Sequence, residues 1–181
     1  MKIKLTNARL AFPQLFEAKT VNGEGKPAFS AAFLIDPADP QVKAINAAIE
    51  QVAKDKWGAK ADAMLTTMRK ADKLALHDGD LKAQYDGFPG NLYISSRSAT
   101  RPLVINTDKT PLIEADGKPY AGCYVNASVE LWAQDNNYGK RINASLGGVQ
   151  FSKDGDAFAG GAASEDEFDD LSAGANADEL V

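Results

Sequence analysis

Apolar and polar residues alternate at the start of the chain, as they do in a strand that buries one face. In "KIKLTNARLAF", Ile3 and Leu5 fall on one face and the residues between them fall on the other. The phase shifts at residues 7–8, which predicts a β-bulge. Leu10 and Phe12 are then expected to return to the buried face, so the stretch predicts one long, bent strand.

The same alternation returns further along the chain. "GCYVNASVELW" places Val125 and Val129 on one face and Asn126 and Glu130 on the other. A Gly pair at residues 147–148 breaks the phase and predicts a further bend. The expected strands cover residues 29–36, 91–97, 122–132 and 141–146, with a loop at residues 21–27 and a hairpin turn at residues 134–140.

One stretch between the strands has the period of a helix. Within residues 38–58, apolar residues such as Ile45 and Ile49 recur at three- and four-residue steps. Asp39 is expected to cap this helix, because its carboxylate can accept a hydrogen bond from a free backbone N–H. A shorter helix is expected over residues 59–70.

These elements predict a mainly β fold with inserted α-helices. Five to seven strands with a helical insertion at about residues 38–70 fit an OB-fold-like barrel of five or slightly more strands. We expect this domain to span residues 1–154. Residues 155–181 have too few apolar side chains to pack, which predicts a flexible acidic C-terminal tail.

Charge is divided unevenly between the two parts. The formal net charge of the whole chain is −5, which by itself argues against binding to nucleic acid. However, residues 164–181 hold 7 of the 25 acidic residues and no Lys or Arg. The other 18 acids stand against 20 Lys and Arg, so residues 1–163 carry a net charge of +2. This asymmetry indicates a weakly basic body with an acidic tail.

The outward faces of the predicted strands carry aromatic rings and basic side chains. Rings can stack on unpaired bases, which contributes about 1–3 kcal/mol per base, and basic side chains contact phosphates and release counterions. The predicted stacking residues are Tyr93, Tyr124, Trp132 and Tyr138, and the predicted phosphate contacts are Lys2, Lys4, Arg97, Arg101, Lys140 and Arg141, with Arg9 as a weaker candidate.

Alternatives stay open for this face. A helix or loop could cover any one ring, and Glu130 in the middle of the face argues against a simple anion groove. The same features would also suit an OB-type module that binds another protein or a saccharide.

The tail contains the acidic stretch "SEDEFDDL". A tethered acidic segment can mimic a phosphate backbone at a high effective concentration, so we expect it to compete with DNA and, once displaced, to recruit a basic partner. The residues expected to do so are Glu165, Asp166, Glu167, Phe168, Asp169 and Asp170. The alternative is that the tail only keeps the protein soluble.

Candidates for catalysis are few. His77, Asp78 and Asp80 lie in "LHDGD", which suggests a metal site, but a turn explains the same spacing and no second His supports it. Cys123 lies in an alternating stretch and is expected to be a buried thiol. We therefore expect no enzyme activity, no metal and no cofactor, with a metal-dependent hydrolase as a third option.

The chain shows no apolar segment of the kind found in a signal peptide or a membrane span. We therefore expect a cytoplasmic protein that does not contact a membrane.

The order of the motifs "ARLAFPQLFE", "FSAAFLID", "KWG", "LHDGD" and "GCYVNASVELWAQDNNYGKRINASLGGVQF", before a Gly-rich acidic tail, resembles the single-stranded DNA-binding proteins of tailed bacteriophages. The resemblance covers nearly the whole chain. It implies an OB-fold core and non-sequence-specific binding of single-stranded DNA during phage replication and recombination in the bacterial host. It also implies that the tail recruits phage or host replication proteins, and it implies no catalysis. A homodimer is compatible with the sequence.

Overall fold

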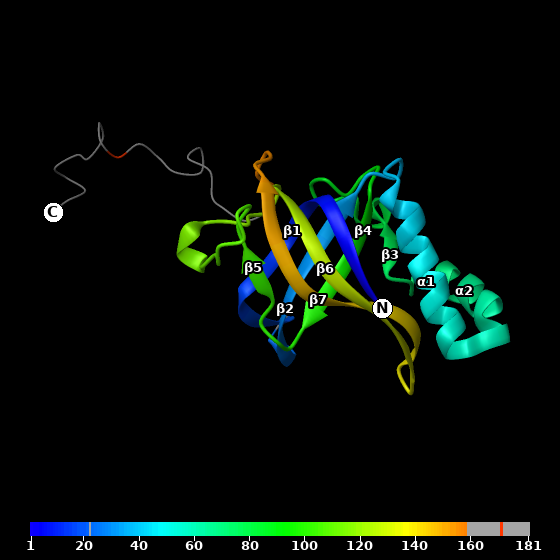
Figure 1. The fold of residues 1–181 in the computed structure, drawn as a ribbon. Coiled ribbons are helices and arrows are strands. Elements are labelled where there is room, and N and C mark those ends of the chain that lie inside the picture. The colour runs from blue at the N-terminus through cyan, green and yellow to red at the C-terminus, as the bar shows by residue number, and fades with distance from the viewer. Residues whose placement is uncertain (22, 159–170, 172–181) are drawn as a thin grey trace.

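The computed structural model describes residues 1–21, 23–158 and 171, and its order of elements is shown in Figure 1. The strands are β1 (Lys2–Val21), β2 (Glu24–Ile35), β3 (Leu76–Asp78), β4 (Leu92–Ser98), β5 (Leu103–Ile105), β6 (Tyr124–Asn136) and β7 (Gly139–Lys153), and the helices are α1 (Gln41–Trp57) and α2 (Ala61–Lys70). Short 3₁₀ turns occupy Gly58–Lys60, Gly79–Lys82 and Glu114–Asp116.

Five of the strands close into a barrel. β1 lies between β2 and β6, β2 continues to β4, and β6 continues to β7. The ring is completed where β4 meets β7 in parallel, with Arg97 opposite Ser145. Two antiparallel hairpins, β1–β2 and β6–β7, and a single parallel contact that closes the ring are typical of an OB-fold-like barrel. The predicted fold class is confirmed. β3 and β5 are short additions to β4 and β7.

Bulges bend the long strands so that they can follow the barrel wall. The ladder between β1 and β6 shifts between Leu5 and Ala8, and Asn7 has a φ of 47°, as the phase change in the sequence predicted. In β7 the extra residue is Gly147, where a Cβ would lie 3.1 Å from the Ser128 carbonyl oxygen. These bulges increase local twist and curvature.

Phe12 does not return to the buried face, so that prediction was wrong. Its φ is 48°, and the β1–β2 register shifts directly after Ala11. The irregularity turns the Phe12 ring outward, where it meets the Tyr85 ring edge-on at 4.9 Å. Leu10, in contrast, is fully buried as predicted.

Both predicted helices are present between β2 and β4. α1 buries Ile45 and Ile49 against the barrel, on the side of β1 and β6, and α2 packs beside α1 (Figure 1). The Asp39 carboxylate accepts a hydrogen bond from the Gln41 N–H at 2.9 Å. Pro40 nevertheless stands directly before the helix, so the helix begins one residue later than a cap at Asp39 implies.

The expected loop at residues 21–27 is largely strand. β1 runs to Val21 and β2 begins at Glu24, so the connection is a tight turn. The short strands β3 and β5 were not predicted, because three residues carry too little alternation to recognise.

Residues 154–158 lie against the barrel. The Tyr120 hydroxyl donates to the Asp154 carboxylate at 2.6 Å, and the Phe158 N–H donates to the Ala121 carbonyl at 3.0 Å. The Arg9 guanidinium stands 4.4 Å from the centre of the Phe158 ring. The tail expected from residue 155 is therefore held by the barrel over its first four residues, and the acidic stretch 164–170 lies outside the described residues.

Cys123 is fully buried, and burial raises the pKa of its thiol to about 11. The thiolate is the reactive form of cysteine, so this residue behaves as an apolar core side chain, as predicted. None of the helices in the described part of the chain has the length and apolar character needed to cross a bilayer.

We expect Ile94→Ala to lower the free energy of unfolding by about 2–5 kcal/mol, because Ile94 is fully buried inside the barrel. The matched change Ile113→Ala, at a side chain that is 62% exposed, should alter it by less than about 0.5 kcal/mol. Urea unfolding followed by circular dichroism measures both. Equal losses in the two variants would contradict the placement of the core.

Candidate nucleic-acid interface

A groove of about 800 Å³ lies on the outer surface where β4 and β7 close the barrel. Its lining comes from the start of β2, from β4, from the β6–β7 hairpin, and from β3 and the segment that leads into it. The side chains that line it are Lys26, Pro27, Ala28, Leu74, Ala75, His77, Ser95, Arg97, Ser98, Ala99, Trp132, Gln134, Tyr138, Arg141, Ile142, Asn143, Ala144 and Ser145.

Strand alternation explains why this surface is polar and aromatic while the interior is apolar. Trp132 on β6 stands opposite Asn143 on β7, and both are at outward positions. Their neighbours Leu131 and Ile142 point inward and are fully buried. The sequence therefore sets the two faces independently, since successive side chains in a strand point to opposite sides.

The groove combines exposed rings with cations. Trp132 is 44% exposed and Tyr138, at the hairpin turn, is 89% exposed. Lys26, Arg97 and Arg141 bring positive charge from three different strands. Of the described side chains that form its walls, none is acidic. Such a surface attracts an anion and offers flat rings for stacking.

Amide groups on the hairpin are tied to one another. The Asn143 side chain donates to Gln134 at 2.8 Å, and the Gln134 side chain donates to Asn136 at 3.2 Å. These bonds hold the outward amides in place beside Trp132. The most prominent free features of the groove are therefore its rings and its cations.

Four of the ten predicted contact residues meet in this groove: Arg97, Trp132, Tyr138 and Arg141. They come from three strands and a turn, so the barrel closure brings them together. Glu130, which argued against an anion site, is exposed on β6 but lies outside the groove lining, opposite Lys2 on β1.

Tyr93 was predicted to point outward and to offer its ring for stacking, and the second part was wrong because the ring is covered. It does lie on the outer face of β4, but it is only 3% exposed. The Phe88 ring packs on it edge-on at 5.1 Å and the His77 ring stacks on it at 4.9 Å. Burial, together with the nearby Asp72 carboxylate, raises the pKa of the Tyr93 phenol. The covering segment between β3 and β4 has no regular period that the sequence could reveal.

The other five predicted contacts lie elsewhere on the surface. Lys4 lines a separate hollow beside Leu103 of β5, and Lys140 faces α2 on the other side of the hairpin from Arg141. The Arg101 guanidinium lies 5.9 Å from the centre of the Phe29 ring. Tyr124 is half-buried, with Lys153 at 4.8 Å over its ring, and Lys2 is exposed on β1.

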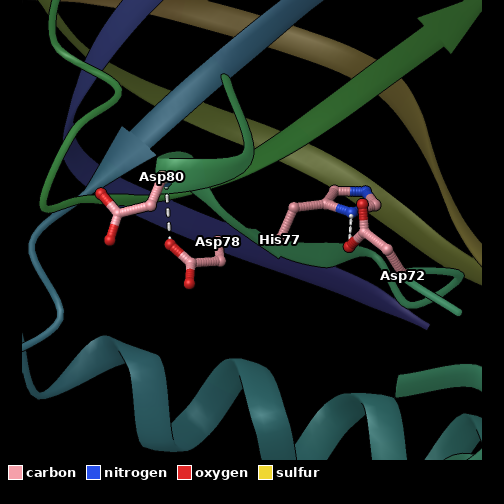
Figure 2. A network of polar contacts seen from close by, with 4 residues as sticks. All are labelled: Asp72, His77, Asp78 and Asp80. Carbon is pink, nitrogen blue, oxygen red and sulfur yellow. Dashed lines mark hydrogen bonds and ion pairs between the residues drawn. The ribbon is translucent and has the colours of Figure 1, made fainter. Parts of the chain in front are cut away.

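Lys26 and His77 line the groove but were not predicted to contact nucleic acid. Lys26 was assigned to a loop, and a lone Lys there carries no signal. His77 was considered only as a metal ligand. In Figure 2 its ring faces Asp72, whose carboxylate lies 2.6 Å from Nδ1, and it points away from Asp78 and Asp80.

Asp78 and Asp80 form a turn. The Asp78 carboxylate accepts from the Asp80 N–H at 2.9 Å (Figure 2), and the Asp80 carboxylate accepts from the Gly90 N–H at 2.9 Å. Within residues 1–158, apart from residue 22, no three His, Cys, Asp or Glu side chains gather as a metal site would need. The "LHDGD" motif therefore serves the turn that follows β3.

A closed five-stranded barrel with an outer groove of rings and cations fits the class of OB-fold proteins that bind single-stranded nucleic acid. Comparison with known families agrees. The chain belongs to the family described as the single-stranded DNA-binding protein of Enterobacter phage Enc34, whose model matches residues 1–181. The resemblance inferred from the sequence motifs is confirmed.

Individual relatives support the same placement. The chain is 50% identical over 176 residues to putative protein p50 of Acyrthosiphon pisum secondary endosymbiont phage 1, covering 95% of each chain. It is similar to the single-stranded DNA-binding protein of bacteriophage Enc34 solved in complex with ssDNA, with 30% identity, a TM-score of 0.73 and coverage of 87% of this chain and 89% of that one. The gp2.5 protein of bacteriophage T7, described as a single-stranded DNA-binding protein, shares 13% identity at a TM-score of 0.55 over 92% of each chain, which shows a shared fold.

Proposed function

We propose that this protein binds single-stranded DNA without sequence specificity through the groove between β4 and the β6–β7 hairpin. The observation that carries the proposal is that two exposed rings, Trp132 and Tyr138, share one groove with Arg97 and Arg141. Each base stacked on a ring contributes about 1–3 kcal/mol. The similar protein of bacteriophage Enc34 was solved in complex with ssDNA, which supports this proposal.

The lack of sequence specificity follows from the chemistry of the groove. Every base has a face that can stack and every nucleotide has a phosphate. Duplex DNA keeps its bases stacked inside, so rings on the protein surface favour unpaired strands. The contacts we propose are Arg97, Trp132, Tyr138 and Arg141, together with Lys26, which the structure adds to the groove.

The biological role we propose is in phage DNA replication and recombination, without catalysis. The acidic tail, with Phe168 among its carboxylates, would compete with DNA for the cations of the barrel and would recruit replication proteins when DNA displaces it. The charge division along the chain supports this, because the 7 acids of residues 164–181 follow a body with a net charge of +2.

We expect the fluorescence of Trp132 to be quenched when oligo-dT is added, because its ring would stack on a base. The variant Trp57→Phe leaves Trp132 as the one tryptophan and should keep the quenching. The matched variant Trp132→Phe leaves Trp57, which donates from Nε1 to Asp135 on the hairpin, and should lose most of it. Quenching that survives only in Trp132→Phe would remove Trp132 from the site.

We expect the affinity for oligo-dT to fall as the salt concentration rises. The variant Arg141→Gln loses one phosphate contact, so the slope of log affinity against log salt should become shallower by about 0.7. The matched control Arg69→Gln changes the same charge on α2, away from the groove, and should leave the slope unchanged. Fluorescence anisotropy at several salt concentrations gives the slopes. A protein that binds oligo-dT with no salt dependence would overturn the phosphate contacts, and one that binds none at all would favour a protein- or saccharide-binding module.

We expect deletion of residues 164–181 to tighten DNA binding by about tenfold at low salt, because the competing carboxylates are gone. Since exposed charges are screened by salt, the difference should shrink as salt rises. A full-length variant with the seven acids changed to Asn or Gln separates charge from tail length and should match the deletion. Weaker binding by either variant would refute competition by the tail.

A further inference from the structure

His77 forms part of the groove wall. It lies on β3 directly opposite Tyr93 on β4, and the two rings stack with centres 4.9 Å apart and planes 24° apart. The side chain is 13% exposed, and it contributes to the lining of the groove. One face of the imidazole is therefore held by a buried ring while part of its edge reaches the groove.

The Asp72 carboxylate holds the edge of this imidazole that carries Nδ1. Its Oδ1 lies 2.6 Å from Nδ1 of His77 (Figure 2). Asp72 is the first residue past the cap of α2, with a φ of 56°, and the Lys73 N–H bonds the Met68 carbonyl at 2.8 Å. This is the helix ending in which Gly usually takes the left-handed position. The left-handed conformation costs more free energy for a residue with a Cβ than for Gly. The Asp72 carboxylate is therefore held beside His77 at a cost in backbone free energy.

The second ring nitrogen of His77, Nε2, is open to solvent. The one hydrogen bond of this side chain uses Nδ1. Among the described buried and half-buried residues, every side-chain nitrogen or oxygen that is sealed from solvent has a hydrogen-bond partner. Nε2 is therefore not sealed from solvent, and since His77 is one of the residues that line the groove, we infer that a ligand there can reach it.

We propose that His77 is a pH-dependent contact to a DNA phosphate in this groove, and that Asp72 and Tyr93 position its ring. The proposal rests on the proposed function, since it adds a contact to the same site. With Nδ1–H donated to Asp72, neutral His77 presents a bare acceptor at Nε2. The protonated ring donates from both nitrogens, one to Asp72 and the other to a phosphate oxygen.

The charged groups around the ring set the sign of the effect. Asp72 faces Nδ1, Lys82 lies 5.6 Å from the Tyr93 ring, and Arg97 on β4, Arg141 on β7 and Lys26 on β2 line the same groove. The cations attract a phosphate at any pH. Only protonated His77 can donate to that phosphate from Nε2, so binding takes up a proton and DNA affinity should rise as pH falls.

The test uses the fact that the chain contains one His. Histidine changes charge between about pH 5 and 8, so oligo-dT binding is measured at pH 8 and pH 6 over a range of salt concentrations. For the natural sequence, one added phosphate contact at pH 6 should steepen the salt slope by about 0.7, which at 0.1 M salt is roughly a fivefold gain in affinity. His77→Gln should show equal slopes at both pH values. The variant keeps the N-terminal amine, so that group is controlled.

Two further measurements keep the proposal testable if His77→Gln is unstable. The titration midpoint of the single imidazole, followed by NMR in the natural protein, should move to higher pH when oligo-dT is bound. Asp72→Gly suits the left-handed backbone and should melt at an equal or higher temperature, yet it should reduce the pH-dependent part of DNA binding because the ring is no longer held.

The outcomes separate this proposal from the function it rests on. Oligo-dT binding with no change in the imidazole signals, or with the same pH dependence in His77→Gln, would overturn the role of His77 and leave the groove in place. No binding of oligo-dT at either pH would overturn the proposed function itself.

Discussion

The parallel contact between β4 and β7 closes the barrel and thereby places both the core and the groove. It closes the barrel at Arg97 and Ser145, which are far apart in the sequence. Without it, the outer face of β4 and the β6–β7 hairpin would not form two walls of one groove. The same closure seals Ile94 and Ile142 inside. The site and the core are therefore two faces of one sheet, and neither exists before the long-range strand pairing has formed.

Elements with a clear period could be predicted from the sequence. The alternation in β6 and β7 gave the buried and exposed faces, and it placed Trp132 and Arg141 outward. The prediction for Tyr93 failed because its exposure depends on a neighbouring segment that has no regular hydrophobic period. Tyr93 has the outward position expected of it, but Phe88 from an irregular segment covers it. Lys140 is a different case, because it and Arg141 are successive residues of β7 and strand alternation directs them to opposite sides.

The contacts that His77 makes in the fold explain what the sequence could not show about it. In sequence it stands beside Asp78 and Asp80, which suggested a metal. In the fold its partners are Asp72 from the end of α2 and Tyr93 from β4. The segment 154–158 gives a parallel case, because Arg9 and Tyr120 hold it at the root of the acidic tail. The β3–β4 pairing brings Tyr93 to His77, and the fold brings Arg9 and Tyr120 to segment 154–158 from far along the chain.

Unpaired DNA is proposed to lie along the groove between β4 and the β6–β7 hairpin. Photo-crosslinking of a 4-thiothymidine oligonucleotide, followed by mass spectrometry of the linked peptides, tests it most directly. If the strand lies there, Trp132 and Tyr138 should carry the crosslinks. Crosslinks confined to residues outside the groove, such as Tyr124 or Lys4, would rule it out.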